Sequence, residues 1–103
     1  MYRVILSPEA EDDLVRIYRY IAFAGFPENG TRFVEKIADF CQGLTTFPKR
    51  GTARPDVAKG IRTISFNQQV TVIFEVVEEQ MVVNIGRIVQ RRRDVERALK
   101  YFR

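Results

Sequence analysis

The sequence predicts an α+β domain in which a helical hairpin packs on one face of a curved antiparallel β-sheet, with the element order βααβββα. Two successive segments in the first half repeat apolar residues at helical spacing, and three β-branched runs with short connections follow in the second half. A last helical repeat closes the chain. At 103 residues the chain has the length of one domain, 1–103, with room for a single core.

The first strand and the first helix meet at Ser7-Pro8. Residues 2–6 are β-branched and aromatic in character, which is typical of a strand. The Ser7 hydroxyl can accept a hydrogen bond from an amide of the first helical turn, and Pro8, which lacks an amide hydrogen, fits the first helical position. We expect a helix from here to about Phe23. Its apolar stripe consists of Ala10, Leu14, Ile17, Tyr18 and Ile21.

A second helix is expected to begin at Pro27, after the break at Gly25-Phe26. Phe47-Pro48 ends it, and since the connection around Gly25 is short, the two helices should form an antiparallel hairpin. The apolar side chains of the second helix again follow helical spacing: Phe33, Ile37, Phe40, Cys41 and Leu44.

The second half predicts a surface loop over 49–59 and then strands at 61–66, 70–77 and 82–89. The loop is rich in Gly, Pro and charge, whereas the strands are separated by short polar connections, so they form an antiparallel meander. Along 70–77 the alternate residues Val, Val, Phe and Val make one face wholly apolar and leave the other mixed. The apolar face needs the hairpin as its cover, and Phe66 and Phe74 are predicted to lie in this core.

A short terminal helix is predicted after Asp94, which we expect to be its N-cap. The apolar residues there recur at i, i+3, i+4 and i+7: Val95, Ala98, Leu99 and Phe102.

Positive charge is concentrated at the end of the chain. The net charge is +4, yet seven basic residues stand against two acidic ones between Ile85 and Arg103, and the first 84 residues sum to −1. A localised positive field suggests an anionic partner.

Several chemistries are excluded or unsupported. The chain has no histidine, which excludes histidine acid/base catalysis and the common zinc sites. The acidic residues 9–13 complement the positive end of a helix, so we expect no metal there and no cofactor elsewhere. The single cysteine, Cys41, is predicted to be a buried thiol. Without a signal peptide or a membrane span, we expect a cytoplasmic protein with no membrane partner.

Two arginines in the predicted sheet each allow two interpretations. Arg62, at the start of the meander, is either a ligand for phosphate or carboxylate or one half of a surface ion pair. Arg87 is expected on the same side of the last strand as Val83, Ile85 and Val89, where a charge is unusual. It is therefore either an edge residue that prevents aggregation or part of a site, and we favour the site.

The basic ending supplies the remaining candidates. Arg91, Arg92 and Arg93 form the densest positive patch, which is either a solvated face or a contact surface for a partner. Tyr101 and Phe102 either dock on the core or remain exposed as anchors for a partner.

Six segments form a series along the chain: Ser7–Leu14, Ile17–Ile21, Leu44–Gly51, Gly60–Arg62, Val83–Val89 and Arg91–Asp94. In this order they resemble the RelE/ParE superfamily of bacterial type II toxins, and specifically its ParE-like branch. The resemblance covers nearly the whole chain. One departure is Gln90, which stands where family members often carry a histidine just before the basic ending. This lowers the expectation of ribonuclease activity.

The resemblance implies a toxin that forms a hetero-oligomer with a cognate antitoxin, whose C-terminal segment wraps over the helices and sheet. The ParE-like branch implies inhibition of DNA gyrase by binding, without a catalytic site, and this is the leading hypothesis. The alternative is a RelE-like mRNA interferase that cleaves message on the ribosome. In that case Arg62, Arg87, Arg91 or Arg93 would hold the phosphate and Tyr101 would assist. A third hypothesis is a basic nucleic-acid-binding domain without toxic function.

Overall fold

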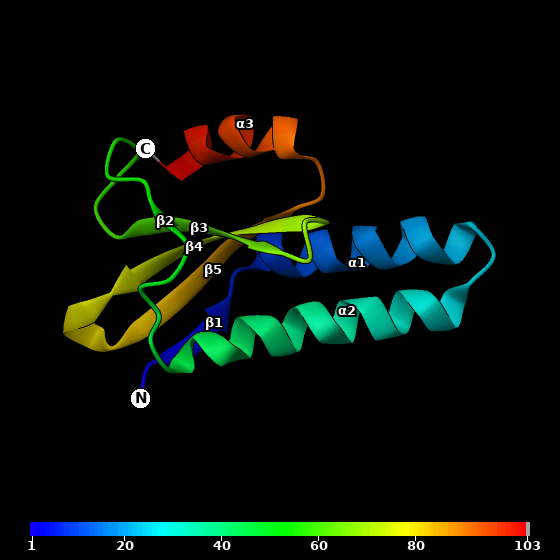
Figure 1. Cartoon of the computed structure of the whole chain (residues 1–103), viewed down its shortest axis with the longest axis horizontal. Coiled ribbons are helices and arrows are strands. Elements are labelled where there is room, and N and C mark those ends of the chain that lie inside the picture. Colours follow the sequence, from blue (N-terminus) through cyan, green and yellow to red (C-terminus); the bar gives the residue numbers. More distant parts are fainter. Residues whose placement is uncertain (103) are drawn as a thin grey trace.

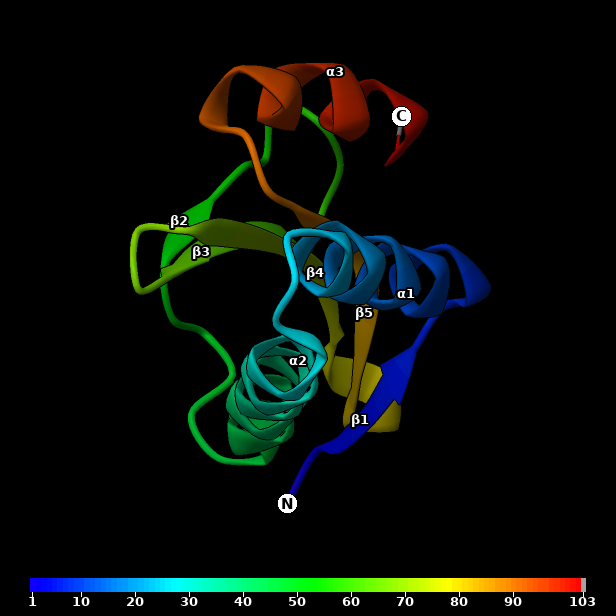
Figure 2. The same ribbon diagram turned by 90° about the vertical axis from the view of Figure 1, so that its right-hand side faces the viewer.

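The computed structural model describes residues 1–102 and confirms the predicted α+β architecture. Its helices and strands are β1 (Arg3–Leu6), α1 (Pro8–Phe23), α2 (Pro27–Gln42), β2 (Thr52–Ala53), β3 (Ile61–Phe66), β4 (Val70–Val77), β5 (Val82–Val89) and α3 (Val95–Leu99). The sheet lies between two helical layers, with the α1–α2 hairpin on one side and α3 on the other (Figures 1 and 2). The far half of the hairpin projects beyond the sheet (Figure 1).

The sheet has the strand order β1-β5-β4-β3-β2. Strands β3, β4 and β5 form the predicted antiparallel meander with the predicted bounds. Strand β1 pairs with β5 in parallel, from Arg3 opposite Val82 to Leu6 opposite Ile85, so the sheet is mixed. The hairpin provides the long crossover that a parallel neighbour requires.

The expected loop over 49–59 contains a short strand, which is a correction to the prediction. Thr52 pairs with Thr63 and Ala53 pairs with Arg62, in antiparallel register. This strand has two exposed residues and no alternation of apolar and polar side chains, so the sequence carries no signal for it.

Both helices of the hairpin begin where the sequence predicts. The Ser7 hydroxyl accepts a hydrogen bond from the Ala10 amide at 3.0 Å and donates one to the Gly86 carbonyl at 2.9 Å. It therefore caps α1 and also fixes the start of α1 to β5. The two helices approach closely at Gly30, where an added Cβ would lie 3.1 Å from the Tyr18 ring. Helix α2 ends at Gln42 and passes into a 3₁₀ turn, somewhat before the predicted stop at Phe47.

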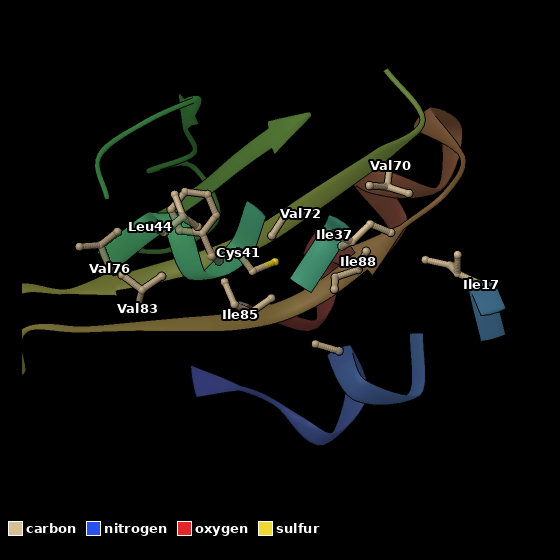
Figure 3. Packing of buried hydrophobic residues seen from close by; sticks show 12 residues of the cluster. Ile17, Ile37, Cys41, Leu44, Val70, Val72, Val76, Val83, Ile85 and Ile88 are labelled. Carbon is tan, nitrogen blue, oxygen red and sulfur yellow. The ribbon is translucent and has the colours of Figure 1, made fainter. Parts of the chain in front are cut away.

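Two separate apolar clusters fill the two sides of the sheet. The cluster under the hairpin includes Ile17, Ile37, Cys41 and Leu44 from the helical side, and alternate residues of β4 from the sheet (Figure 3). These β4 residues are Val70, Val72, Phe74 and Val76, as predicted. Ile73 projects to the opposite side and joins Leu99 and Val89 in the second cluster, under α3. Phe66 is partly buried at the border of the first cluster, with its ring centroid 5.0 Å from that of Phe40 and the two rings tilted by 43°.

A β-bulge at Gly86 overturns one expectation about Arg87. Ile73 pairs with Arg87 but the next residue, Phe74, pairs with Ile85, so Gly86 is an extra residue in β5. The bulge shifts the alternation by one position. Val83 and Ile85 consequently face the hairpin, whereas Val89 faces α3, and Arg87 does not share one side with all three.

The terminal helix forms after Asp94 as predicted and packs on the second cluster, but Asp94 does not cap it with its side chain. Asp94 has helical backbone angles that continue a preceding 3₁₀ turn, so its carboxylate makes no capping hydrogen bond and instead lies 3.7 Å from Arg97. Arg54 from the loop before β3 donates two hydrogen bonds to Glu96, at 2.6 and 2.8 Å, and so fastens α3 to the loop. These hydrogen bonds raise the pKa of Arg54 above its ordinary value.

Candidate functional site

A basic cleft of about 320 Å³ lies where β5 ends, between α1 and α3. Its charged residues are Asp13, Arg16, Arg87, Arg91, Asp94 and Arg97. Four arginines against two aspartates leave the cleft positive. Tyr101, whose ring is exposed, and Gln90 also line the cleft.

Asp13 is the structural centre of the cleft. Its side chain is only 4% exposed, and its Oδ2 accepts hydrogen bonds from Arg87 Nε at 2.7 Å and from the Ile88 amide at 2.8 Å. Its Oδ1 accepts from Arg87 Nη2 at 3.1 Å and from Arg16 Nη1 at 3.0 Å. Both carboxylate oxygens are therefore fully engaged, and the pair with Arg87 is bidentate.

The pairing with Asp13 determines what Arg87 can do. Hydrogen bonding to Asp13 raises the pKa of Arg87, which keeps the guanidinium charged. The side chain is still 28% exposed and faces the cleft. Arg87 can therefore present positive charge at the cleft wall, but its Nε and Nη2 hydrogens are already donated to a carboxylate.

Arg91, Arg97 and Tyr101 form the exposed rim of the cleft. Arg91 and Arg97 are exposed, and Tyr101 has 80% of its surface accessible. Long exposed guanidinium groups beside an aromatic ring can bind a carboxylate or a phosphate group. Of the residues proposed from the sequence, Arg87, Arg91 and Tyr101 line this one cleft.

Arg62 does not line this cleft. It pairs with Phe74 across β3 and β4, and cross-strand partners project from the same face, so it lies on the side of the hairpin. Its Nε donates to the Arg50 carbonyl at 2.8 Å. Among residues 1–102 it forms no ion pair, so it matches neither the expected surface pair nor a shared site with Arg87.

The remaining predicted site residues, Arg92, Arg93 and Phe102, also lie outside the cleft. Arg92 lies near Gln68 and Gln69 at the β3–β4 turn, and Arg93 is exposed outside the cleft. Phe102 is half-buried and packs on Gly86, where an added Cβ would lie 2.3 Å from its ring. Of the terminal aromatic pair, Phe102 therefore docks and Tyr101 remains exposed. Arg103 lies outside the described residues.

Four charged residues of the cleft were not predicted as site residues: Asp13, Arg16, Asp94 and Arg97. Asp13 did carry a signal, because it lies three residues after Ala10 and four before Ile17, on the buried stripe of α1. A carboxylate in that position needs a buried partner. Arg16 and Arg97 follow no pattern that distinguishes them from other exposed arginines on helices.

Metal and membrane features can be assessed for the described part of the chain. Residues 1–102 contain no group of three or more metal-ligating side chains close enough to share an ion. No helix in the same range is long and apolar enough to cross a membrane. Cys41 is buried as predicted, and burial raises the pKa of its thiol to about 11.

The structure is a small α+β domain with a basic cleft, and comparisons with known proteins identify its family. A family model described as the ParE toxin of the type II toxin-antitoxin system parDE matches residues 4–95. The chain therefore belongs to the ParE toxin family of type II toxin-antitoxin systems. No curated protein sequence matches the chain significantly.

Solved structures show the same fold at low sequence identity. The chromosomal ParDE system from P. aeruginosa matches with a TM-score of 0.73 and 24% identity, over 87% of this chain and 96% of that one. The intact E. coli RelBE toxin-antitoxin complex matches with a TM-score of 0.65 and 12% identity, over 88% and 98%. The isolated E. coli RelE toxin matches with a TM-score of 0.64 and 13% identity, over the whole of both chains.

Proposed function

We propose that this type II toxin acts by binding DNA gyrase and inhibiting it, without catalysing a reaction of its own. The observation that carries the proposal is the bidentate pairing of Arg87 with the buried carboxylate of Asp13. An arginine held in this way is a fixed recognition group on the cleft wall.

The distribution of the other residues supports binding over catalysis. Cleavage of a phosphodiester needs a group that accepts a proton and groups that converge on the phosphate. Asp13 uses both oxygens within the protein, the chain has no histidine, and Arg62 lies away from Arg87 and Tyr101. A surface that recognises a protein has no need for such convergence.

We further propose a cognate antitoxin as the protein that neutralises this toxin in a hetero-oligomeric complex. Two of the structures with this fold are described as toxin-antitoxin systems or complexes. An acidic, partly apolar antitoxin segment complements the basic cleft, since charge accelerates encounter while apolar burial supplies affinity. The polar contacts would fall on Arg91 and Arg97, whose guanidinium groups are exposed at the rim.

The second candidate function is an mRNA interferase that acts on ribosome-bound message. One observation favours it: Arg87, Arg91 and the exposed Tyr101 line a single cleft that could receive a phosphate group. In this case Arg91 would hold the phosphate and Tyr101 would assist proton transfer.

The test is to purify the toxin with its antitoxin, release the toxin, and measure gyrase supercoiling and message cleavage in parallel. The proposal predicts inhibited supercoiling and intact message in a translation extract. Cleaved message with normal gyrase activity would establish the second candidate instead. The antitoxin-bound toxin serves as the control in both assays.

A further inference from the structure

We propose that the outer face of the distal half of α1, with the hairpin tip, is a docking surface for an acidic protein surface of the toxin's target. The inference rests on the proposed function, in that the target is a protein. It concerns Arg16, Arg19, Tyr20, Phe23 and Phe26, none of which lies in the core. This set is called the α1 stripe.

The α1 stripe exposes aromatic side chains that the fold does not use. Phe23 is 86% exposed, Tyr20 is 70% exposed and Phe26 is 60% exposed. The end of α1 and the turn to α2, which carry these residues, belong to the part of the hairpin that projects beyond the sheet (Figure 1). Exposed aromatic residues gathered in one place mark an interaction surface, because aromatic anchors contribute much of the affinity at protein interfaces.

Helical geometry makes the stripe continuous with the basic cleft. Arg16, Tyr20 and Phe23 follow at i, i+4 and i+7, so they share one face of α1, and Arg16 itself lines the cleft. One partner can therefore contact the cleft and the hairpin tip together. The cleft alone offers mostly charged groups and one exposed ring, whereas a stable protein interface buries roughly 800 Å² on each partner and needs apolar anchors.

The charge of the stripe defines the chemistry of its occupant. From Leu14 to Pro27 the sequence contains Arg16 and Arg19 but no acidic residue. The complementary surface is therefore acidic, with an apolar recess for the rings.

The experiment compares the double variant Tyr20→Ala/Phe23→Ala with Phe47→Ala, whose ring is 84% exposed at a site outside both the stripe and the cleft. The stripe variant should require at least about tenfold more toxin for half-inhibition of gyrase and should lose growth arrest on expression in a bacterial host. Phe47→Ala should match wild type. Affinity for the cognate antitoxin should stay within about twofold in both, which also shows that the variants fold. Arg19→Glu, which reverses a charge at an exposed position, should weaken inhibition as well.

Failure of this inference is distinguishable from failure of the proposed function. If wild type inhibits gyrase and the stripe variant inhibits it equally well, the docking surface is wrong and the proposed function stands. If the wild-type toxin leaves gyrase active, the proposed function fails, and the growth-arrest assay then tests the docking surface. Growth arrest that the stripe variant retains overturns the inference. Growth arrest that the stripe variant loses supports the inference for another protein target. If the stripe variant loses only its affinity for the antitoxin, or only its binding to duplex DNA, the α1 stripe binds the antitoxin or DNA. Either result would overturn the inference.

Discussion

Asp13 accepts a 2.8 Å hydrogen bond from the backbone amide of Ile88, which lies 75 residues further along the chain. Strand β1 pairs with β5 only as far as Ile85, so beyond this point the edge of β5 has no neighbouring strand. The Asp13 carboxylate on α1 thus accepts a hydrogen bond that a carbonyl of a neighbouring strand would otherwise accept. The same carboxylate also binds Arg87.

Asp13→Ala is expected to lower the free energy of unfolding by about 3 kcal/mol, because it leaves the Arg87 guanidinium and the Ile88 amide without their acceptor. Urea denaturation of the released toxin measures the change. Arg16→Ala, which removes an exposed partner of the same carboxylate, is the control and should cost no more than about 0.5 kcal/mol. Equal effects of the two substitutions would contradict the central role of Asp13.

Ser7→Ala is expected to destabilise the fold by about 1 to 2 kcal/mol, since one hydroxyl caps α1 and also binds the Gly86 carbonyl. Ser7→Thr retains the hydroxyl and should recover most of the loss. Thermal unfolding of the three proteins gives the comparison. A Thr variant as unstable as the Ala variant would show that the hydroxyl is not responsible.

Gly86→Ala is expected to displace the Phe102 ring and to cost about 1 to 2 kcal/mol, because the new methyl group would lie 2.3 Å from that ring. The same substitution in a Phe102→Ala background should cost clearly less. A double-mutant cycle should therefore give a coupling of about 1 kcal/mol. Additive effects would mean that Phe102 does not dock on the bulge.

Cys41 predicts a dependence of stability on alkaline pH. Burial raises its pKa from the ordinary 9.0 to about 11, so between these values the unfolded thiol loses its proton while the folded thiol retains it. Its contribution is fully present below pH 9 and falls as the pH rises toward 11. The loss of stability between pH 8 and 11 should be smaller in Cys41→Ala, which removes this titration. Identical pH profiles would contradict the burial of the thiol.

The sequence predicted those features that depend on local spacing. Ser7-Pro8 marked the start of α1, and the alternation along β4 identified which side chains face the hairpin. The buried position of Cys41 followed from its helical spacing from Ile37. Each of these signals lies within a few residues of the feature that it predicts.

Features that depend on distant pairing could not be predicted in this way. The two-residue strand β2 has no periodicity of its own, and the parallel pairing of β1 with β5 joins residues about 80 positions apart. The extra residue Gly86 reverses the alternation of side chains after it. The prediction that Arg87 shares one side of the sheet with Val83, Ile85 and Val89 was therefore wrong. Arg62 and Arg93, two of the basic residues expected in a site, lie outside the cleft.

We propose that the toxin recognises gyrase and does not catalyse a reaction. A titration of gyrase supercoiling with released toxin tests it most directly, with message integrity followed in the same concentration range. The account predicts inhibition that saturates when toxin and gyrase reach stoichiometric amounts, while message stays intact. Message cleavage at toxin far below the concentration of message, with gyrase fully active at excess toxin, would contradict it.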